Sequence, residues 1–159
     1  MPGQCRVPAV RLALATPTGR NSDRADEPGS SPSARVPYMA TRSLVLKLTT
    51  GKDEPERCNQ ALTVAAAAAA SGVPVSLWLT GEASWFALPD GCPDLQLPHA
   101  TPLPELFATV LKMGTVTLCT QCAARRDITD ADVVEGVRIS GATTFVAEVL
   151  AEGAQALVY

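Results

Sequence analysis

The sequence predicts an α/β fold in which a mostly parallel sheet is covered by helices on both of its faces. Short apolar segments, partly β-branched and typical of buried strands, alternate along the chain with segments that favour helix. Strands that alternate with helices pair in parallel, because each helix carries the chain back across one face of the sheet. The five predicted strands lie at residues 43–48, 73–79, 116–118, 137–139 and 156–158.

The first 38 residues differ in composition from the rest of the chain. Residues 20–37 contain almost nothing apolar, so burial cannot offset the entropy cost of ordering them. Residues 6–15 resemble a weak signal or transit segment, but Pro8 and Arg11 interrupt the short apolar stretch. We therefore expect residues 1–38 to be a disordered tail or an over-extended start. The folded domain is expected over residues 39–159.

A helix is predicted over residues 55–70, directly after the first strand. Pro55 fits a first helical turn, the alanine-rich run that follows favours helix, and Gly72 ends it. Either Asp53 or Thr50 is placed to cap the start of this helix. Its small side chains allow it to lie close against a sheet.

Three more helices are predicted in the second half of the chain. Residues 104–113 have an amphipathic pattern that Gly114 stops. A short helix is predicted to start at residues 129–132, because a threonine that can cap it precedes acidic residues. Residues 142–152 form the last predicted helix, which Gly153 ends.

A long connection over residues 80–97 carries two neighbouring aromatic residues, Trp85 and Phe86. They form either a hydrophobic plug over one end of the sheet, or a wall of the functional site or an oligomer contact. The plug is favoured, since large aromatic side chains bury well. His99, the single histidine, has no second ligand candidate nearby, so neither a metal site nor a general base is predicted there.

Composition limits the class of function. The chain has 159 residues and a formal net charge of −3, which gives no general attraction to nucleic acid or to anionic membranes. No apolar run approaches the roughly 20 residues that span a bilayer. The five cysteines are odd in number and unevenly spaced, unlike a disulfide scaffold, and this predicts a reducing, cytoplasmic environment. No cofactor is predicted.

The candidate functional residues follow the third strand. Cys119 comes directly after residues 116–118, at the carboxyl end of a strand, where open α/β sheets place their ligands. If a helix begins near Cys122, its unpaired N–H groups and its dipole favour an anion. Arg125 and Arg126 add two positive charges one turn further on. Both effects lower the pKa of a thiol and favour the nucleophilic thiolate, so the pattern predicts a reactive sulfur.

The pair of cysteines has three other interpretations. Half of a zinc site would need a second pair, and Cys5, Cys58 and Cys92 are too scattered to supply one. A thioredoxin-like dithiol has the same Cys-x-x-Cys spacing and permits reversible disulfide chemistry. Free cysteines also bury well as inert core residues. The position after a strand, with two arginines next, favours a reactive thiol.

The segment Cys-Thr-Gln-Cys-Ala-Ala-Arg-Arg-Asp at residues 119–127, together with residues 141–159, resembles the DsrE/DsrF/TusD-like group of small sulfur-relay proteins. The resemblance covers about residues 42–159. It implies a five-stranded α/β sandwich and assembly into trimers or hexamers, as homomers or with paralogous subunits. Asp127 stands where the family usually has glycine and sets a negative charge near the thiols. The loop at residues 85–104 matches nothing specific, so no partner follows from it.

The resemblance implies a cytoplasmic sulfur carrier of sulfurtransferase type that works with donor and acceptor proteins. The sulfur-carrying cysteine of the relay proteins corresponds to Cys119, which would hold a sulfane sulfur as a persulfide. Arg125 and Arg126 would stabilise the anion, and Cys122 would resolve the persulfide or form a disulfide with Cys119. Two alternatives stay open: a redox-sensing or disulfide-exchanging dithiol, which needs both cysteines, and a non-catalytic binding subunit, which needs neither. Whether the protein is an enzyme in its own right is left open.

Overall fold

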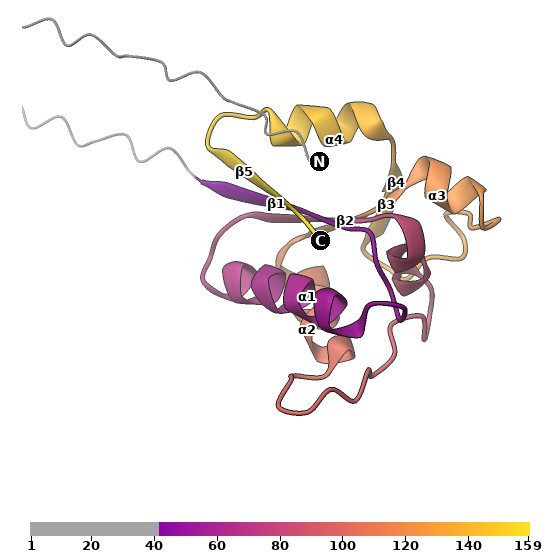
Figure 1. Cartoon of the computed structure of the whole chain (residues 1–159). Helices are drawn as coiled ribbons and strands as arrows, with labels where there is room; N and C mark the ends of the chain where they lie inside the picture. The colour runs from indigo at the N-terminus through magenta and orange to yellow at the C-terminus, as the bar shows by residue number, and fades with distance from the viewer. Residues whose placement is uncertain (1–41) are drawn as a thin grey trace, which may run out of the picture. The chain divides into compact units, whose positions relative to one another are not determined.

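The computed structural model describes residues 42–159, which form a five-stranded sheet with helices on both faces (Figure 1). The strands are β1 Ser43–Leu48, β2 Val75–Leu79, β3 Thr115–Cys119, β4 Val137–Ser140 and β5 Ala154–Val158. The helices are α1 Pro55–Ala70, the 3₁₀ helix η1 Gly81–Ala87, α2 Leu103–Met113, α3 Thr120–Ala124 and α4 Ala142–Val149. The tail predicted over residues 1–38 lies outside the described residues.

Every strand pair in the sheet is parallel, in the order β4-β3-β2-β1-β5. The chain adds β2, β3 and β4 outward from β1 and then returns to place β5 on the other side of β1. Because all strands run the same way, their carboxyl ends meet at one edge of the sheet, together with the loops that follow them. The predicted fold class is confirmed.

One face of the sheet carries the main hydrophobic core. Leu46, Leu77 and Leu118 point to this face and are fully buried. They pack in one cluster with the buried alanines of α1 and with the apolar side of α2. The small side chains of α1 let its backbone lie close to the strands, as the sequence predicts. Burial of apolar surface is the main favourable term in the stability of this part of the fold.

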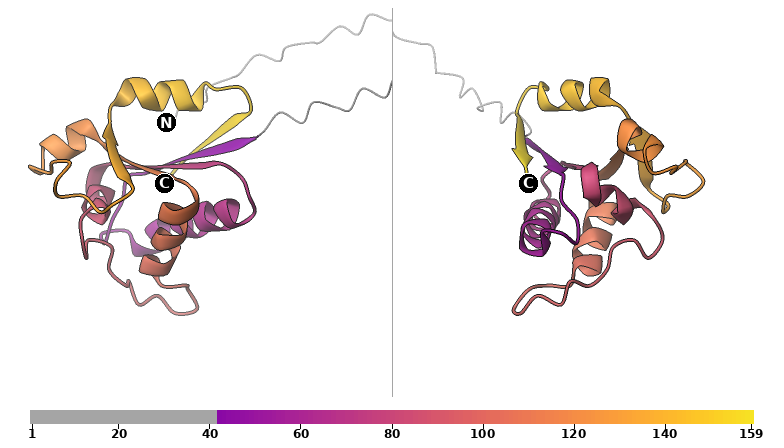
Figure 2. Two further views of the ribbon diagram at one scale, coloured as in Figure 1. Left: turned by 180° about the vertical axis from the view of Figure 1, so that it is seen from behind. Right: turned by 45° about the vertical axis from the view of Figure 1, so that its right-hand side comes forward.

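The opposite face, here called the α4 face, carries a row of polar and aromatic side chains. Strand register places Lys47, Trp78, Thr117 and Arg138 side by side across β1, β2, β3 and β4. Their neighbours along each strand point to the other face, because side chains alternate along a strand. Figure 2 shows α4 on this side of the sheet, opposite α1 and α2. None of the residues of α4 is buried.

Polar contacts hold α4 to the sheet. The Glu148 carboxylate accepts hydrogen bonds from Ser76 Oγ at 2.6 Å and Trp78 Nε1 at 2.7 Å, and it pairs with Arg138. The Phe145 ring meets the Trp78 ring edge to face, with their centroids 5.3 Å apart. This helix is therefore fixed by a few specific contacts and not by a broad apolar interface.

Two local predictions are wrong. Glu54 occupies the cap position of α1, and its side chain makes no capping hydrogen bond. The Asp53 carboxylate instead accepts a hydrogen bond from Gly51 N–H at 2.7 Å. Residues 129–132 form a turn and not a helix. Asp132 Oδ2 accepts hydrogen bonds from the N–H and hydroxyl groups of Thr129, at 2.8 and 2.6 Å. Such side-chain bonds offer the backbone an alternative to helix.

The two aromatic residues of the long connection have different environments. This connection contains η1, which the sequence analysis did not predict. Phe86 is 1% exposed and belongs to the hydrophobic core, as expected of a plug. Trp85 is 40% exposed and lies at the surface.

A close backbone contact joins the loops that follow β1 and β2. Gly81 has a φ of +52°, and a Cβ atom at this position would lie 2.5 Å from the carbonyl oxygen of Thr49. Gly72 also has a positive φ, +79°, but a Cβ atom there would meet nothing within 4 Å. The two glycines share the backbone conformation and differ in the space around them.

Both Gly72→Ala and Gly81→Ala should destabilise the protein, and Gly81→Ala should do so more. The left-handed conformation costs a non-glycine residue about 1–2 kcal/mol at either position. Gly81→Ala must also displace the Thr49 carbonyl. Urea unfolding monitored by circular dichroism measures the difference between the two variants. Equal losses would mean that the loop after β1 yields freely.

Candidate functional site

Cys119 is the last residue of β3 and occupies the cap position of α3, at the carboxyl edge of the sheet. Its side chain is partly exposed. Cys122 lies within α3 and is buried. The turn from strand into helix thus brings the two thiols together, with Cys119 the more accessible from solvent.

The surroundings of Cys119 favour its ionised form. Burial by itself raises the pKa of the Cys119 thiol. Hydrogen bonds from the N–H groups of Cys122 and Gln121 and from the Cys122 thiol lower this pKa, and the positive charge of Lys47 lowers it too. The lowering effects prevail, so the pKa of Cys119 lies below that of an ordinary thiol. A thiol with a lowered pKa supplies more of the nucleophilic thiolate at neutral pH.

Cys122 is held by a backbone donor from the neighbouring loop. The N–H group of Gly81, at the start of η1, donates to Cys122 Sγ at 3.3 Å. This contact joins α3 to η1 across a separation of 41 residues in sequence. The contact with η1 therefore holds the sulfur of Cys122 in place.

Cys58 and Cys92 have the opposite character. Both are free. Burial raises the pKa of Cys58 to about 12, with smaller contributions from Cys92 and Asp53, and burial likewise raises the pKa of Cys92 to about 12. These thiols remain protonated at neutral pH and have the character of core side chains.

The two predicted arginines have different positions. Arg126 forms an ion pair with Glu82 of η1, with 2.7 Å between Nη2 and Oε1, and its guanidinium carbon lies 5.5 Å from the centre of the Trp85 ring. It also donates to the carbonyl oxygen of Cys122 at 3.4 Å. Arg126 therefore links the turn that follows α3 to η1. Arg125 is exposed and makes no ion pair within residues 42–159.

Sequence reasoning missed Lys47 as a site residue. The available signal was a lysine inside an otherwise apolar strand that helices were predicted to cover on both faces. Alternation along β1 places Lys47 on the face opposite Leu46, which is the face that Cys119 shares. Strand order and register were needed to bring these two residues into one environment.

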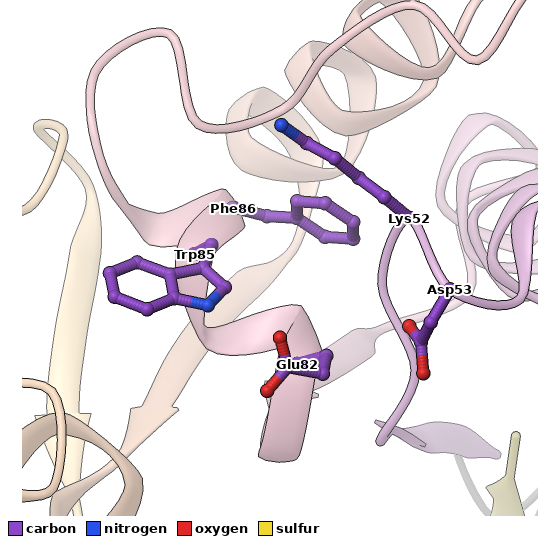
Figure 3. A pocket seen from close by; sticks show the side chains of 5 residues that line it. All are labelled: Lys52, Asp53, Glu82, Trp85 and Phe86. Carbon is purple, nitrogen blue, oxygen red and sulfur yellow. The ribbon is translucent and has the colours of Figure 1, made fainter.

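A cavity of about 330 Å³ lies between the loop after β1 and η1. Figure 3 shows Lys52 and Asp53 on one side of it, with Glu82, Trp85 and Phe86 coming from η1. Glu82 and Trp85 are also the two residues that contact Arg126. Trp85 and Phe86 therefore both line this cavity, and Trp85 also contacts Arg126.

The described residues contain neither a metal site nor a membrane-spanning helix. Within residues 42–159, no group of three or more His, Cys, Asp or Glu side chains is arranged to hold a metal ion. His99 is exposed in the loop between η1 and α2. None of the helices in this part of the chain is long and apolar enough to cross a membrane.

The fold and the site define a small, parallel α/β protein that presents a cysteine of lowered pKa at the carboxyl edge of its sheet. The model of the DsrE/DsrF-like family matches residues 43–159, and the chain belongs to this family. Family membership suggests a function related to sulfur relay.

A solved structure has the same fold. The chain is similar to the YchN protein from E. coli, with a TM-score of 0.61 and 19% sequence identity, over 74% of this chain and 99% of YchN. A conserved protein of unknown function from Bacteroides thetaiotaomicron, BT1422, matches with a TM-score of 0.47 and 15% identity, over 74% of this chain and 95% of BT1422. No curated protein sequence matches the chain.

Iodoacetamide at pH 7 should modify Cys119 well before Cys58 and Cys92. The lowered pKa of Cys119 should place its half-maximal rate below the pH of about 8.5 that a free cysteine shows. A Cys5→Ser variant of the full chain, digested and mapped by mass spectrometry, measures each site. Equal modification of all sites, or faster modification of Cys58, would contradict the environments described above.

Proposed function

We propose that this protein is a sulfur carrier that accepts a sulfane sulfur on Cys119 as a persulfide and passes it to a partner protein. The observation that carries the proposal is the environment of Cys119, which is partly exposed and has a lowered pKa. A carrier needs an accessible thiolate to attack the donor, and among the described cysteines Cys119 fits this need best. Membership of the DsrE/DsrF-like family supports the same chemistry.

The transfer is a thiol exchange that balances without an added oxidant. The Cys119 thiolate attacks the outer sulfur of a donor persulfide, R–S–SH. A bond forms between Cys119 Sγ and that sulfur, the S–S bond of the donor breaks, and its electron pair leaves on the donor thiolate, R–S⁻. The carrier then holds Cys119–S–SH, and an acceptor thiolate removes the outer sulfur by the same step in reverse.

Cys122 would set the lifetime of this persulfide. Its thiolate can attack the inner sulfur, so that a Cys119–Cys122 disulfide forms and HS⁻ leaves. The burial of Cys122 opposes this attack, because it limits the movement and access of the Cys122 sulfur. We therefore assign Cys122 a resolving role that is slow compared with transfer to a partner.

A redox dithiol is the second candidate function. The hydrogen bond from the Cys122 thiol to the Cys119 sulfur favours it, because the two sulfurs lie near each other. In this function a partner disulfide would oxidise both thiols to a Cys119–Cys122 disulfide and leave as two thiols. A third possibility is a binding subunit in which the cysteines only pack.

The proposal includes partner proteins and self-assembly. In this proposal the protein acts in the reducing cytoplasm, and the domain of residues 39–159 carries the sulfur. Donor and acceptor proteins, and a trimer or hexamer of like or paralogous subunits, are the partners. Support for assembly comes from exposed apolar side chains: Val146 and Leu150 of α4 are 48% and 77% exposed, and Val158 of β5 is 66% exposed. Val146 and Leu150 are four residues apart, about one helical turn, and exposed apolar patches commonly mark protein contacts.

Incubation with a persulfide donor should add one sulfur to the protein, seen in the intact mass under non-reducing conditions. Cys119→Ser should lose the added sulfur. Cys122→Ser should retain it, for longer than the wild-type protein, because the resolving thiol is gone. An internal disulfide in the wild type, with no adduct in either variant, would favour the redox dithiol. No uptake of sulfur from any donor would exclude the carrier.

Light scattering at micromolar concentration should report a species larger than a monomer. Leu150→Asp, on α4, should lower the mass by placing a charge on the apolar patch. Met113→Asp is the matched control, because Met113 is an exposed apolar residue on α2, across the sheet from the patch. A monomeric wild type, or equal effects of the two substitutions, would contradict assembly through α4.

A further inference from the structure

We infer that Lys47 is the cation that stabilises the sulfur anion of Cys119, first as the thiolate and then as the persulfide. This inference rests on the proposed sulfur carriage and adds to it the residue that balances the charge of the carried sulfur. It assigns to a strand residue the role that sequence reasoning gave to Arg125 and Arg126.

The first argument is the register of the sheet. Lys47 is level with Trp78 of β2, which is level with Thr117 of β3. Cys119 is two residues beyond Thr117 and therefore points to the same face. The lysine and the thiol share the α4 face, two strands apart, so the charge of Lys47 acts on the sulfur through space and not by direct contact.

The second argument is the way in which the lysine is held. The ammonium group of Lys47 lies 5.2 Å from the centre of the Phe145 ring. Phe145 is itself fixed edge to face against Trp78, which is almost fully buried. A cation over an aromatic face is attracted by the ring but keeps its full charge. The ammonium group is thus positioned on the α4 face without being neutralised.

The third argument is that the neighbouring cations already have carboxylate partners. Arg138 pairs with Glu148, and Arg126 pairs with Glu82. Among the ion pairs within residues 42–159, none includes Lys47. Lys47 is partly buried, where an unpaired charge interacts more strongly with a nearby anion than it would in water. The Glu148 carboxylate on this face is already paired with Arg138, which leaves the sulfur of Cys119 as the anion for Lys47 to stabilise.

Several other charged and titratable groups border this region: Arg138 on β4, Glu148 on α4, Cys122 on α3 and the Glu82–Arg126 pair between η1 and α3. Burial raises the pKa of Glu148, but hydrogen bonds from Ser76, Trp78 and Arg138 and the charge of Arg138 more than offset this, so the pKa lies below its usual value. Glu148 therefore stays ionised and paired while Cys119 titrates. The positive charge of Lys47 also lowers the pKa of Cys119, in agreement with the geometry.

A persulfide anion has a particular need for such a cation. Its charge lies mostly on the outer sulfur, about 2 Å beyond Sγ. That atom is farther than Sγ from the backbone N–H groups that assist the thiolate. The charge of Lys47 acts over a longer range than a hydrogen bond from a backbone donor, so it still stabilises the anion when the charge moves to the outer sulfur.

The test is the pH profile of Cys119 alkylation in the full chain with Cys5→Ser. We expect Lys47→Met, which keeps the apolar stem and removes the charge, to raise the half-maximal pH by about 0.5 to 1 unit. Alkylation at pH 7 then slows by about three- to tenfold. Lys47→Arg should keep the profile near that of the wild type. Lys112→Met is the matched control, because it removes an exposed cation on α2, across the sheet from the α4 face, and it should leave the profile unchanged.

Urea unfolding shows whether each variant is folded. If Lys47→Met does not fold, Phe145→Leu provides the test: it keeps the charge but releases the ammonium group, and it should shift the profile upward by a smaller amount. A Lys47→Met profile that superimposes on the wild type, or a shift of equal size in Lys112→Met, would overturn the inference. So would an unchanged profile in Phe145→Leu, where that variant has to serve as the test.

Sulfur uptake separates this inference from the proposed function. If the wild type takes up sulfur and Lys47→Met alkylates like the wild type, the carrier stands and the role of Lys47 fails. If no sulfur is taken up and Lys47→Met still shifts the profile, the carrier fails and Lys47 remains the cation that acts on the thiolate. Where both hold, the persulfide of Lys47→Met should be lost sooner than that of the wild type.

Discussion

The parallel register of β1, β2 and β3 is the constraint on which the rest of the structure depends. It aligns Leu46, Leu77 and Val116 on the core face, where they are buried under α1 and α2. The same register sets Lys47 and Cys119 on the other face. A slip of one residue in any strand would exchange its two faces and move apolar side chains out of the core. The hydrophobic effect therefore fixes the geometry of the site.

The two faces of the sheet are stabilised in different ways, and this difference has consequences for function. Apolar burial holds α1 and α2, whereas the Glu148 network and the Trp78–Phe145 contact hold α4. A cover built from a few polar contacts tolerates charged side chains beneath it, which a dry core would not. It also leaves apolar residues such as Leu150 on the outside. The face that accommodates the lysine is thus also a face with exposed apolar side chains.

The described cysteines show how environment divides one residue type into two kinds. Cys58 lies in the core, where burial raises the pKa of its thiol to about 12 and keeps it protonated. Cys119 lies where a strand turns into a helix, with N–H donors and a cation nearby, and its pKa is lowered. The thiol pKa values differ because desolvation raises the pKa of a thiol and hydrogen-bond donors lower it.

The sequence by itself determined the elements that depend on neighbours within about one helical turn. Apolar runs predicted the five strands, and the alanine-rich run predicted α1. The position of Cys119 at the end of β3 followed from the apolar run at residues 116–118. Only the tertiary structure decided which side chains meet across long separations, such as Arg126 with Glu82 or Lys47 with Phe145. Local periodicity tells which face a residue points to, but the order and register of strands decide what lies opposite it. Strand order and register come from packing of the whole sheet. Contacts between residues far apart in sequence therefore could not be predicted from the sequence alone.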